Sequence, residues 1–263
     1  MIKKIQYTAR FIRYLLKAKH RKGYGVHSPF AFDLITNVFE EKNHYYSYSE
    51  IEKIRQELLA NISTIDVVDF GTGTSGKRKI SEITSRSLKS EKYAQLMFRL
   101  ANVLKPNIIL ELGTSFGITT AYLASANPNA VVYSLEGCPQ TATIAKSVLD
   151  KCKLKNVTLC VGNIDETLSE VLKSLETIDY AFFDANHTKE ATLNYFNLCL
   201  SKVNDKSVFL FDDIHYSRGM EEAWDVIKND NRVRVSFDLF TLGIVFFNQE
   251  LKKQDYIYSF NVI

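Results

Sequence analysis

The 263-residue sequence has no long uninterrupted apolar run, no C-x-x-C pair and no acidic residue among its first 22 positions. No apolar stretch approaches the roughly 20 residues that a membrane-spanning helix needs. The charged N-terminus offers no signal-peptide cleavage site. The four cysteines stand inside apolar stretches, which favours small buried thiols in a reducing compartment. We therefore expect a cytoplasmic protein without a transmembrane segment.

The absence of acids leaves the N-terminus strongly basic. Residues 1–22 contain eight Lys or Arg, and subtracting these from the net charge of +3 leaves −5 for residues 23–263. Apolar side chains recur at helical spacing over residues 2–19, which predicts a basic amphipathic helix. Such a helix can pack on the rest of the chain or on a second subunit, lie on a membrane surface, or bind nucleic acid. We favour packing with a solvated charged face. The apolar positions are Ile5, Ala9, Ile12, Leu15 and Leu16.

The helical pattern continues through the first ninety residues. Ser28-Pro29 is typical of an N-cap followed by proline at the first helical position, which predicts a helix over residues 30–40. Another helix is expected over about 49–61. We expect residues 1–90 to form a helical annex, or lid, to a domain formed by residues 91–263.

From residue 108 onward, short β-branched runs alternate with helical segments. Continuous apolar strands separated by helices predict a parallel sheet covered on both faces. The last two strands are joined too tightly for a helix, so they must pair antiparallel. We predict an α/β, Rossmann-like, doubly wound and mostly parallel seven-stranded sheet with a C-terminal antiparallel hairpin. The expected strands are 108–112, 131–135, 157–161, 178–183, 207–211, 233–239 and 243–247.

The first of these strands runs directly into a helix through a short glycine-containing segment. In open α/β sheets, ligands bind beyond the carboxyl ends of the strands. Gly113 allows a tight turn there, and Gly117 allows close approach of loop, ligand and helix. The segment is not the G-x-G-x-x-G that surrounds a pyrophosphate, which disfavours a nicotinamide dehydrogenase. The candidate ligand-binding residues of this segment are Glu111, Gly113, Thr114, Ser115 and Gly117.

Polar residues or glycines follow the other parallel strands too. Glu136 ends the next strand, 23 residues after Gly113, where a carboxylate can accept hydrogen bonds from both hydroxyls of a ribose. The third strand ends at Gly162, Asn163 and Ile164, where a backbone amide and the Asn side chain can read an adenine edge. The fourth strand ends in Asp184 and the fifth in Asp212-Asp213. Five such strand ends in succession predict a shared ligand-binding crevice.

Residues 90–247 resemble the small class I O-methyltransferases related to catechol and caffeoyl-CoA O-methyltransferases. The resemblance covers roughly 60% of the chain, a common extent for one domain. It implies S-adenosylmethionine as the methyl donor, with Glu136 on its ribose and Gly162, Asn163 and Ile164 beside its adenine. It also makes residues 91–263 the methyltransferase domain. The matching runs are 110–117, 133–137, 178–187 and 209–213.

The resemblance also bears on the chemistry at the acceptor. The resembling enzymes use Mg²⁺ or another divalent cation, held by one acid after the fourth strand and an Asp-Asn pair after the fifth. Here Asp184 matches the first ligand and Asp212-Asp213 occupies the place of the pair, so a third carboxylate replaces the amide. His187 stands where the family has a catalytic lysine, and an imidazole can also take a proton. A second imidazole, His215, can serve instead.

A competing motif lies at residues 71–78. Gly71-x-x-x-x-Gly76-Lys77 matches a phosphate-binding loop up to its last position, where Arg78 stands in place of the Ser or Thr that would ligate Mg²⁺. No parallel sheet has begun at this point, so we reject a nucleotide triphosphatase. No acidic strand end follows about 20 residues later, which excludes a second cofactor loop. We expect a flexible loop bordering the active site, or a plain turn.

The sequence therefore predicts methyl transfer to a hydroxyl of a small-molecule acceptor. Two alternatives stay open. One is an RNA methyltransferase, for example on tRNA, that uses the basic N-terminal arm for nucleic-acid binding. The other is a non-catalytic S-adenosylmethionine-binding module, which the acids and histidines at the acceptor side disfavour. A homodimer is compatible with either the enzyme or the module.

Overall fold

The computed structural model describes residues 2–68 and 75–260. The chain divides into two compact units, each with its own helices and strands. Unit 1 combines Met1–Glu41 with Ala181–Ile263, and unit 2 is Lys42–Tyr180. Residues 1–41 thus belong to unit 1, and residues 42–90 belong to unit 2.

Unit 2 contains three parallel strands, β3 (Ile108–Leu112), β4 (Val131–Glu136) and β5 (Val157–Val161). β4 pairs with β3 on one side and with β5 on the other. Helices α6 (Ile118–Ala126), α7 (Pro139–Lys151) and α8 (Ile164–Ser174) follow the three strands in turn. The expected strand–helix alternation is therefore confirmed here.

Three further helices complete unit 2: α3 (Tyr46–Ala60), α4 (Ile80–Ser87) and α5 (Glu91–Leu104). The Tyr48 ring lies 5.0 Å from the Phe98 ring and 5.5 Å from the Tyr122 ring, so aromatic contacts join α3, α5 and α6. The Tyr122 hydroxyl donates to Glu52 Oε1 at 2.9 Å. The sequence analysis did not predict α4 or α5.

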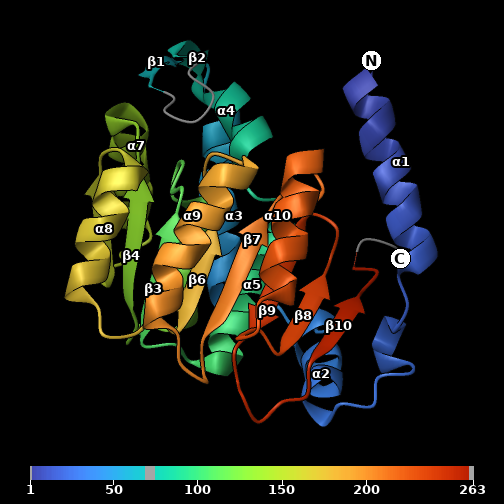
Figure 1. The fold of residues 1–263 in the computed structure, drawn as a ribbon. Helices are drawn as coiled ribbons and strands as arrows, with labels where there is room; N and C mark the ends of the chain where they lie inside the picture. Colours follow the sequence, from blue (N-terminus) through green and yellow to red (C-terminus); the bar gives the residue numbers. More distant parts are fainter. Residues whose placement is uncertain (1, 69–74, 261–263) are drawn as a thin grey trace. The chain divides into compact units, whose positions relative to one another are not determined.

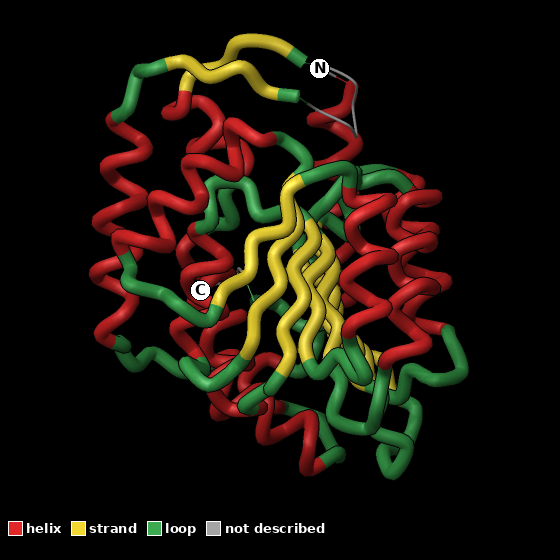
Figure 2. Tube along the Cα trace, turned by 90° about the vertical axis from the view of Figure 1, so that its left-hand side faces the viewer, coloured by secondary structure: helices red, strands yellow, loops and turns green. Residues whose placement is uncertain are grey.

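Unit 2 also has a two-stranded antiparallel ribbon, β1 (Thr64–Val67) and β2 (Gly76–Lys79). Figure 2 shows it as an element separate from the stack of longer strands. Lys77 lies in β2 opposite Asp66, whereas the lysine of a phosphate-binding loop stands at the start of a helix. Residues 76–79 are therefore a strand and not the loop or plain turn that we expected. Residues 69–74 of the competing motif lie outside the described residues.

Unit 1 holds the C-terminal strands β7 (Val208–Asp212), β8 (Val235–Asp238), β9 (Leu242–Phe246) and β10 (Gln254–Ile257). The predicted antiparallel hairpin is confirmed as β8–β9; β9 also pairs antiparallel with β7, and β10 pairs parallel with β8. Helices α9 (Lys189–Cys199) and α10 (Arg218–Asn229) pack side by side (Figure 1).

The boundary between the units falls within β6 (Tyr180–Phe183). The main sheet has eight strands in the described part of the chain, one more than predicted, because β10 was not expected. β10 is a short edge strand with only one fully buried side chain, so its apolar pattern is weak. The α/β class and the mostly parallel sheet with flanking helices are confirmed.

The N-terminal helices of unit 1 pack on its C-terminal strands. They are α1 (Ile2–Lys17), the 3₁₀ turn Arg21–Gly23, α2 (Pro29–Leu34) and the π-helical turn Ile35–Phe39. Ser28 caps α2 as predicted, because its Oγ accepts from the Ala31 amide. The rings of Phe30 and Phe246 lie 5.0 Å apart, so α2 shares an aromatic core with β9. None of the described helices has the length and apolar character needed to cross a membrane.

The contact between β9 and α10 has no space for a side chain at Gly243. A Cβ there would lie 2.6 Å from the buried Trp224 ring. We expect Gly243→Ala to lower the free energy of unfolding by about 1–3 kcal/mol through overpacking. Gly219→Ala in α10 is the matched control, because its Cβ would meet nothing closer than 3.6 Å. Urea unfolding measures both variants, and equal stabilities would contradict this packing.

Candidate functional site

The turn between β3 and α6 is held in a strained conformation. Gly113, Ser115 and Gly117 all have left-handed backbone angles, with φ of +99°, +49° and +76°. The amides of Gly113 and Thr114 both donate to the Leu135 carbonyl at 2.9 and 3.1 Å, which ties the turn to the end of β4. A left-handed residue other than glycine, as at Ser115, is typical of ligand-binding segments.

Glu111 lies in the core beneath this turn and is fully buried. Its Oε2 accepts from the hydroxyls of Thr120 and Ser134, the latter at 2.6 Å. The Thr114 hydroxyl contacts Ser134 Oγ at 2.6 Å. A buried carboxylate needs such partners, and here they join β3, α6 and β4. Glu111 therefore positions the turn from below.

Glu136 places a carboxylate at the carboxyl end of β4. Its Oε2 accepts from the Ser115 amide at 2.8 Å, and its Oε1 accepts from the Cys138 amide at 2.9 Å. Charge-assisted bonds of this kind are stronger than neutral ones. They hold the carboxylate between the β3–α6 turn and the loop that follows β4.

The end of β5 continues the same edge of unit 2. The Gly162 amide donates to the Glu136 carbonyl at 3.0 Å, and Gly162 has φ +148°. The Asn163 side chain accepts from the Asp165 amide at 3.2 Å and caps α8, which begins at Ile164. The side-chain oxygen of Asn163 thus caps α8, and Asn163 lies in the loop that was predicted to contact the adenine.

The β1–β2 ribbon borders this edge of unit 2, where the sequence analysis expected a loop bordering the active site or a plain turn and not a ribbon. The Val68 amide, directly after β1, donates to Cys138 Sγ at 3.4 Å. The same thiol lies 3.7 Å from the Asp66 carbonyl oxygen. Cys138 is buried and adjoins the loop that Glu136 holds. The only sequence signal was the position of a small apolar residue two places after Glu136.

In unit 1, the loop after β6 brings Asp184 and His187 together. Asp184 Oδ1 lies 3.2 Å from His187 Nε2, and both side chains are partly exposed. Asn186 and His187 have φ of +62° and +39°, and the His187 amide donates to the Ala185 carbonyl in a tight turn. A carboxylate beside an imidazole fixes its orientation and its tautomer, which suits a general base.

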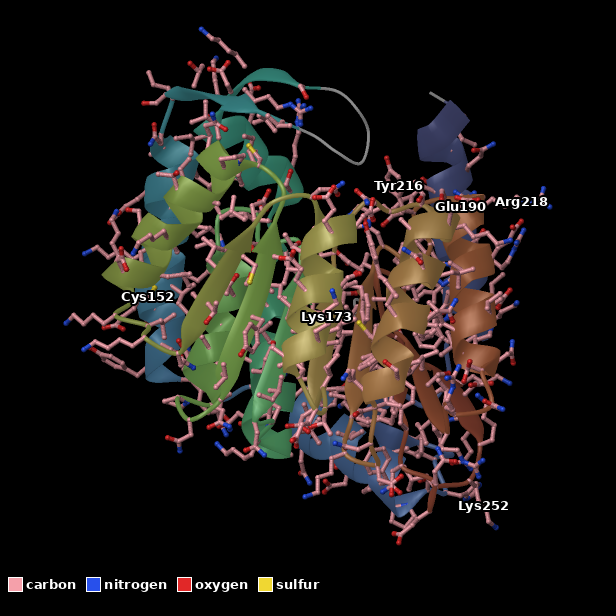
Figure 3. The ribbon with its side chains drawn as sticks, turned by 60° about the vertical axis from the view of Figure 1, so that its left-hand side comes forward. Cys152, Lys173, Glu190, Tyr216, Arg218 and Lys252 are labelled. Atoms are coloured by element: carbon pink, nitrogen blue, oxygen red, sulfur yellow. The ribbon has the colours of Figure 1, made fainter. Side chains whose placement is uncertain are left out.

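The loop after β7 begins at the same end of unit 1. Figure 3 shows Tyr216 at the end where Glu190 and Arg218 stand, in the first turns of α9 and α10. The rings of Tyr216 and His187 lie 6.5 Å apart. Tyr216 is exposed, and the sequence analysis did not select it.

Asp212 and Asp213 occupy this loop without forming a metal site. Asp212 Oδ1 accepts from the Asp213 amide at 2.8 Å, and Asp213 has φ +53°. Across residues 2–68 and 75–260, no group of three or more His, Cys, Asp or Glu side chains has the arrangement to hold a metal ion. The structure therefore does not gather Asp184, Asp212 and Asp213 into one ligand set, and a divalent cation there stays a prediction.

The charge of Asp213 also affects Tyr7 of α1. Burial and the negative charge of Asp213 raise the pKa of the Tyr7 hydroxyl. The Tyr7 ring packs edge-on against Phe240 at 5.1 Å. The N-terminal helix therefore places an aromatic hydroxyl within the electrostatic influence of Asp213, which only the tertiary structure reveals.

His215 lies between two carboxylates. Its Nδ1 is 3.1 Å from Glu221 Oε1, and its Nε2 is 2.8 Å from Asp238 Oδ2. Burial lowers the pKa of His215, but hydrogen bonds and charge from Asp238 and Glu221 more than offset it, so the pKa is raised. Arg10 of α1 pairs with Glu221 at 3.0 Å. Both ring nitrogens are engaged, so we interpret His215 as joining α1, α10 and β8, and His187 as the better-placed base.

Comparison with known proteins agrees with this arrangement. Residues 110–214 match the family model of a methyltransferase domain. The O-methyltransferase imqG of Aspergillus flavus is 27% identical over 168 residues, which are 62% of this chain and 65% of that protein. The chain thus covers less than two thirds of this relative's length.

Two solved structures have the same fold. The O-methyltransferase of Bacillus cereus, in complex with SAH (S-adenosylhomocysteine), has a TM-score of 0.56 and 18% identity over 81% of this chain and 96% of its own. The SAH-bound methyltransferase PaMTH1 of Podospora anserina has a TM-score of 0.60 and 14% identity over 84% of this chain and 96% of its own.

The fold is the Rossmann-like fold of these methyltransferases, and residues 110–214 match a methyltransferase domain. The chain is similar to O-methyltransferases in sequence and in fold, the same class of enzyme that the sequence analysis found it to resemble.

The environment of His215 predicts a pH-dependent stability. The protonated ring is stabilised by Asp238 and Glu221 only in the folded protein, and Arg10 faces the same cluster. Its contribution is therefore fully present below the ordinary pKa of 6.5 and is lost as the pH rises through the raised folded-state value. The loss amounts to about 1.4 kcal/mol for each unit by which folding raises the pKa.

Urea unfolding at about pH 6 and about pH 9 tests this expectation, because the two values lie on either side of an ordinary histidine pKa. The wild type and the control His27→Gln, at an exposed loop histidine, should both lose stability at the higher pH. His215→Gln should reduce that loss. An unchanged pH dependence in His215→Gln would show that the ring is not stabilised as a cation.

Proposed function

We propose that the protein transfers a methyl group from S-adenosylmethionine to a hydroxyl of a small molecule. The observation that carries the proposal is the Glu136 carboxylate, held by the Ser115 and Cys138 amides at the carboxyl end of β4. A nucleoside ribose needs such an acceptor at this edge of an α/β sheet. The methyltransferase family match and the O-methyltransferase relative support the reaction.

The residues of unit 2 suit this cofactor. Glu136 would accept from the ribose hydroxyls, the turn from Gly113 to Gly117 would adjoin the amino-acid part, and Gly162 to Ile164 would adjoin the adenine. The cofactor supplies a methyl group that is already activated on a sulfonium sulfur. The protein's own task is therefore to orient the acceptor and to remove its proton.

His187 and Asp184 are proposed to remove that proton. Asp184 Oδ1 lies 3.2 Å from Nε2, so we propose that the neutral ring carries its proton on Nε2 and that Nδ1 is its basic nitrogen. Nδ1 would take the hydroxyl proton as the oxygen attacks the methyl carbon, and Asp184 would stabilise the resulting imidazolium. This chemistry requires no metal-bound hydroxyl, and we assign no step to Asp212 or Asp213.

The N-terminal annex of residues 1–90 is proposed to take part in acceptor recognition. Its Tyr7 lies beside Asp213 and Phe240, which offers an aromatic surface with one hydroxyl to a small acceptor. The four cysteines are free, which agrees with the reducing cytoplasm as the proposed location.

The role of Glu136 is tested by cofactor binding. We expect Glu136→Gln to weaken S-adenosylmethionine binding by about 10- to 100-fold, because it removes the charge from the hydrogen bonds to the ribose and to the two loops. Isothermal titration calorimetry measures this change. Glu170→Gln, which neutralises an exposed carboxylate of α8, should bind like the wild type. Equal affinity of Glu136→Gln and wild type would refute the assignment.

The role of His187 is tested by turnover. We expect His187→Ala to lower methylation by about 10²- to 10⁴-fold through loss of the base, with S-adenosylmethionine affinity unchanged. Formation of S-adenosylhomocysteine from a panel of catechols and other phenols can be followed by mass spectrometry. His27→Ala, at an exposed histidine of the same unit, is the matched control. Full activity of His187→Ala would exclude this histidine as the base.

A further inference from the structure

Helix α1 has two faces, and the inner one is fully used within unit 1. Tyr7, Phe11 and Tyr14, spaced as i, i+4 and i+7, all contact the Phe240 ring, with centroid distances of 5.1, 4.9 and 5.2 Å. Arg10 adds the ion pair with Glu221 at 3.0 Å. The Tyr14 hydroxyl donates to the Tyr258 carbonyl. These contacts dock the helix through an aromatic face.

The apolar face that the sequence analysis identified is a different one. Ile5, Ile12 and Leu16 are 62%, 53% and 81% exposed, and Ala9 between them is exposed as well. The spacing 5, 9, 12, 16 places these side chains in one stripe along the helix. Scattered exposed apolar residues are ordinary, but a continuous row marks an interaction surface.

The charge beside this stripe indicates what covers it. Arg13 and Lys17 are exposed on the same helix, and Lys19 and Lys22 are exposed just after it. No acid occurs within residues 1–22. Tyr24, which follows, is 81% exposed, and tyrosine is favoured where an apolar surface meets water. An apolar stripe bordered by cations complements an anionic lipid surface, where apolar side chains enter the acyl boundary and cations meet the phosphates.

We propose that α1 attaches the protein to anionic membrane surfaces, lying in the plane of the interface. Ile5, Ile12 and Leu16 would enter the lipid, and Arg13 and Lys17 would lie at the headgroups. A symmetric pairing of two α1 helices would instead bring the exposed Arg13 and Lys17 of one helix near those of the other, which opposes a second copy on this face. An RNA would use the cations but has no need of the isoleucines and leucine. The inference rests on unit 1 alone and does not depend on methyl transfer.

Vesicle flotation of the full chain tests the proposal. The probes are vesicles of phosphatidylcholine alone and of phosphatidylcholine with phosphatidylglycerol. We expect binding to the mixed vesicles that weakens with salt, and little binding to phosphatidylcholine alone. Ile12→Ser/Leu16→Ser and Arg13→Glu/Lys17→Glu should each lower the partition coefficient by at least about tenfold.

Matched controls separate the stripe from general surface effects. Val103→Ser/Val226→Ser changes two valines that are 49% and 51% exposed on α5 and α10, and it should bind vesicles like the wild type. Circular dichroism and unfolding confirm that each variant folds, which is expected because the changed side chains face solvent. Calorimetry with S-adenosylmethionine on the same variants should show unchanged affinity. A failure of the proposed function can therefore be distinguished from a failure of membrane binding.

Three outcomes would overturn the proposal. The first is no binding to phosphatidylglycerol vesicles at low salt. The second is binding that Ile12→Ser/Leu16→Ser leaves unchanged, because the apolar stripe then has no part in it. The third is a dimer, seen by light scattering after gel filtration, that Ile12→Ser/Leu16→Ser dissociates, since a second copy then covers the stripe. RNA binding that needs Arg13 and Lys17, found together with no vesicle binding, would overturn the proposal in the same way as the first outcome.

Discussion

The loops of unit 2 depend on a buried carboxylate, that of Glu111. A buried polar group is costly unless hydrogen bonds satisfy it, and here the hydroxyls of Thr120 and Ser134 donate to Glu111 Oε2. Those bonds fix β3, α6 and β4 against one another beneath the Gly113 turn. Glu136, one strand further, then finds the Ser115 amide in place. The edge of unit 2 that we propose to bind the cofactor is thus built on a polar network in the core, and its preorganisation would avoid ordering these loops when a ligand arrives.

A second polar network organises unit 1. The two ring nitrogens of His215 hydrogen-bond with Glu221 and Asp238, and Arg10 of α1 forms an ion pair with Glu221. The N-terminal helix is therefore fastened to elements more than two hundred residues away in sequence. This attachment directs the aromatic face of α1 inward and leaves its aliphatic stripe outward. The helix that contributes Tyr7 to the surroundings of Asp213 also presents a surface that suits a lipid interface.

Much of the fold was predictable because its signals are local. Apolar runs, turn glycines and the Ser28-Pro29 cap each act within a few residues, so β3, β5 and the start of α2 were predicted well. Helix α4 was missed because it lies in a polar stretch next to the competing glycine motif. Helix α5, which follows it, was missed as well. The ribbon and β10 were missed because their strands are short and have few buried side chains, so their apolar pattern is weak.

By itself the sequence determined the α/β class, the order of the elements and the strand ends that carry Glu136, Asp184 and His187, because these follow from periodicity and turn chemistry. Only the tertiary structure decided what each side chain contacts. Glu111 points into the core, His215 lies between two acidic side chains, and Asp184 lies beside His187. It also decided which face of α1 packs. The aliphatic face has the stronger helical spacing of apolar residues, but the aromatic face packs against Phe240 and Glu221. Which face packs depends on the residues available to contact it, and the spacing of residues along the helix does not specify these.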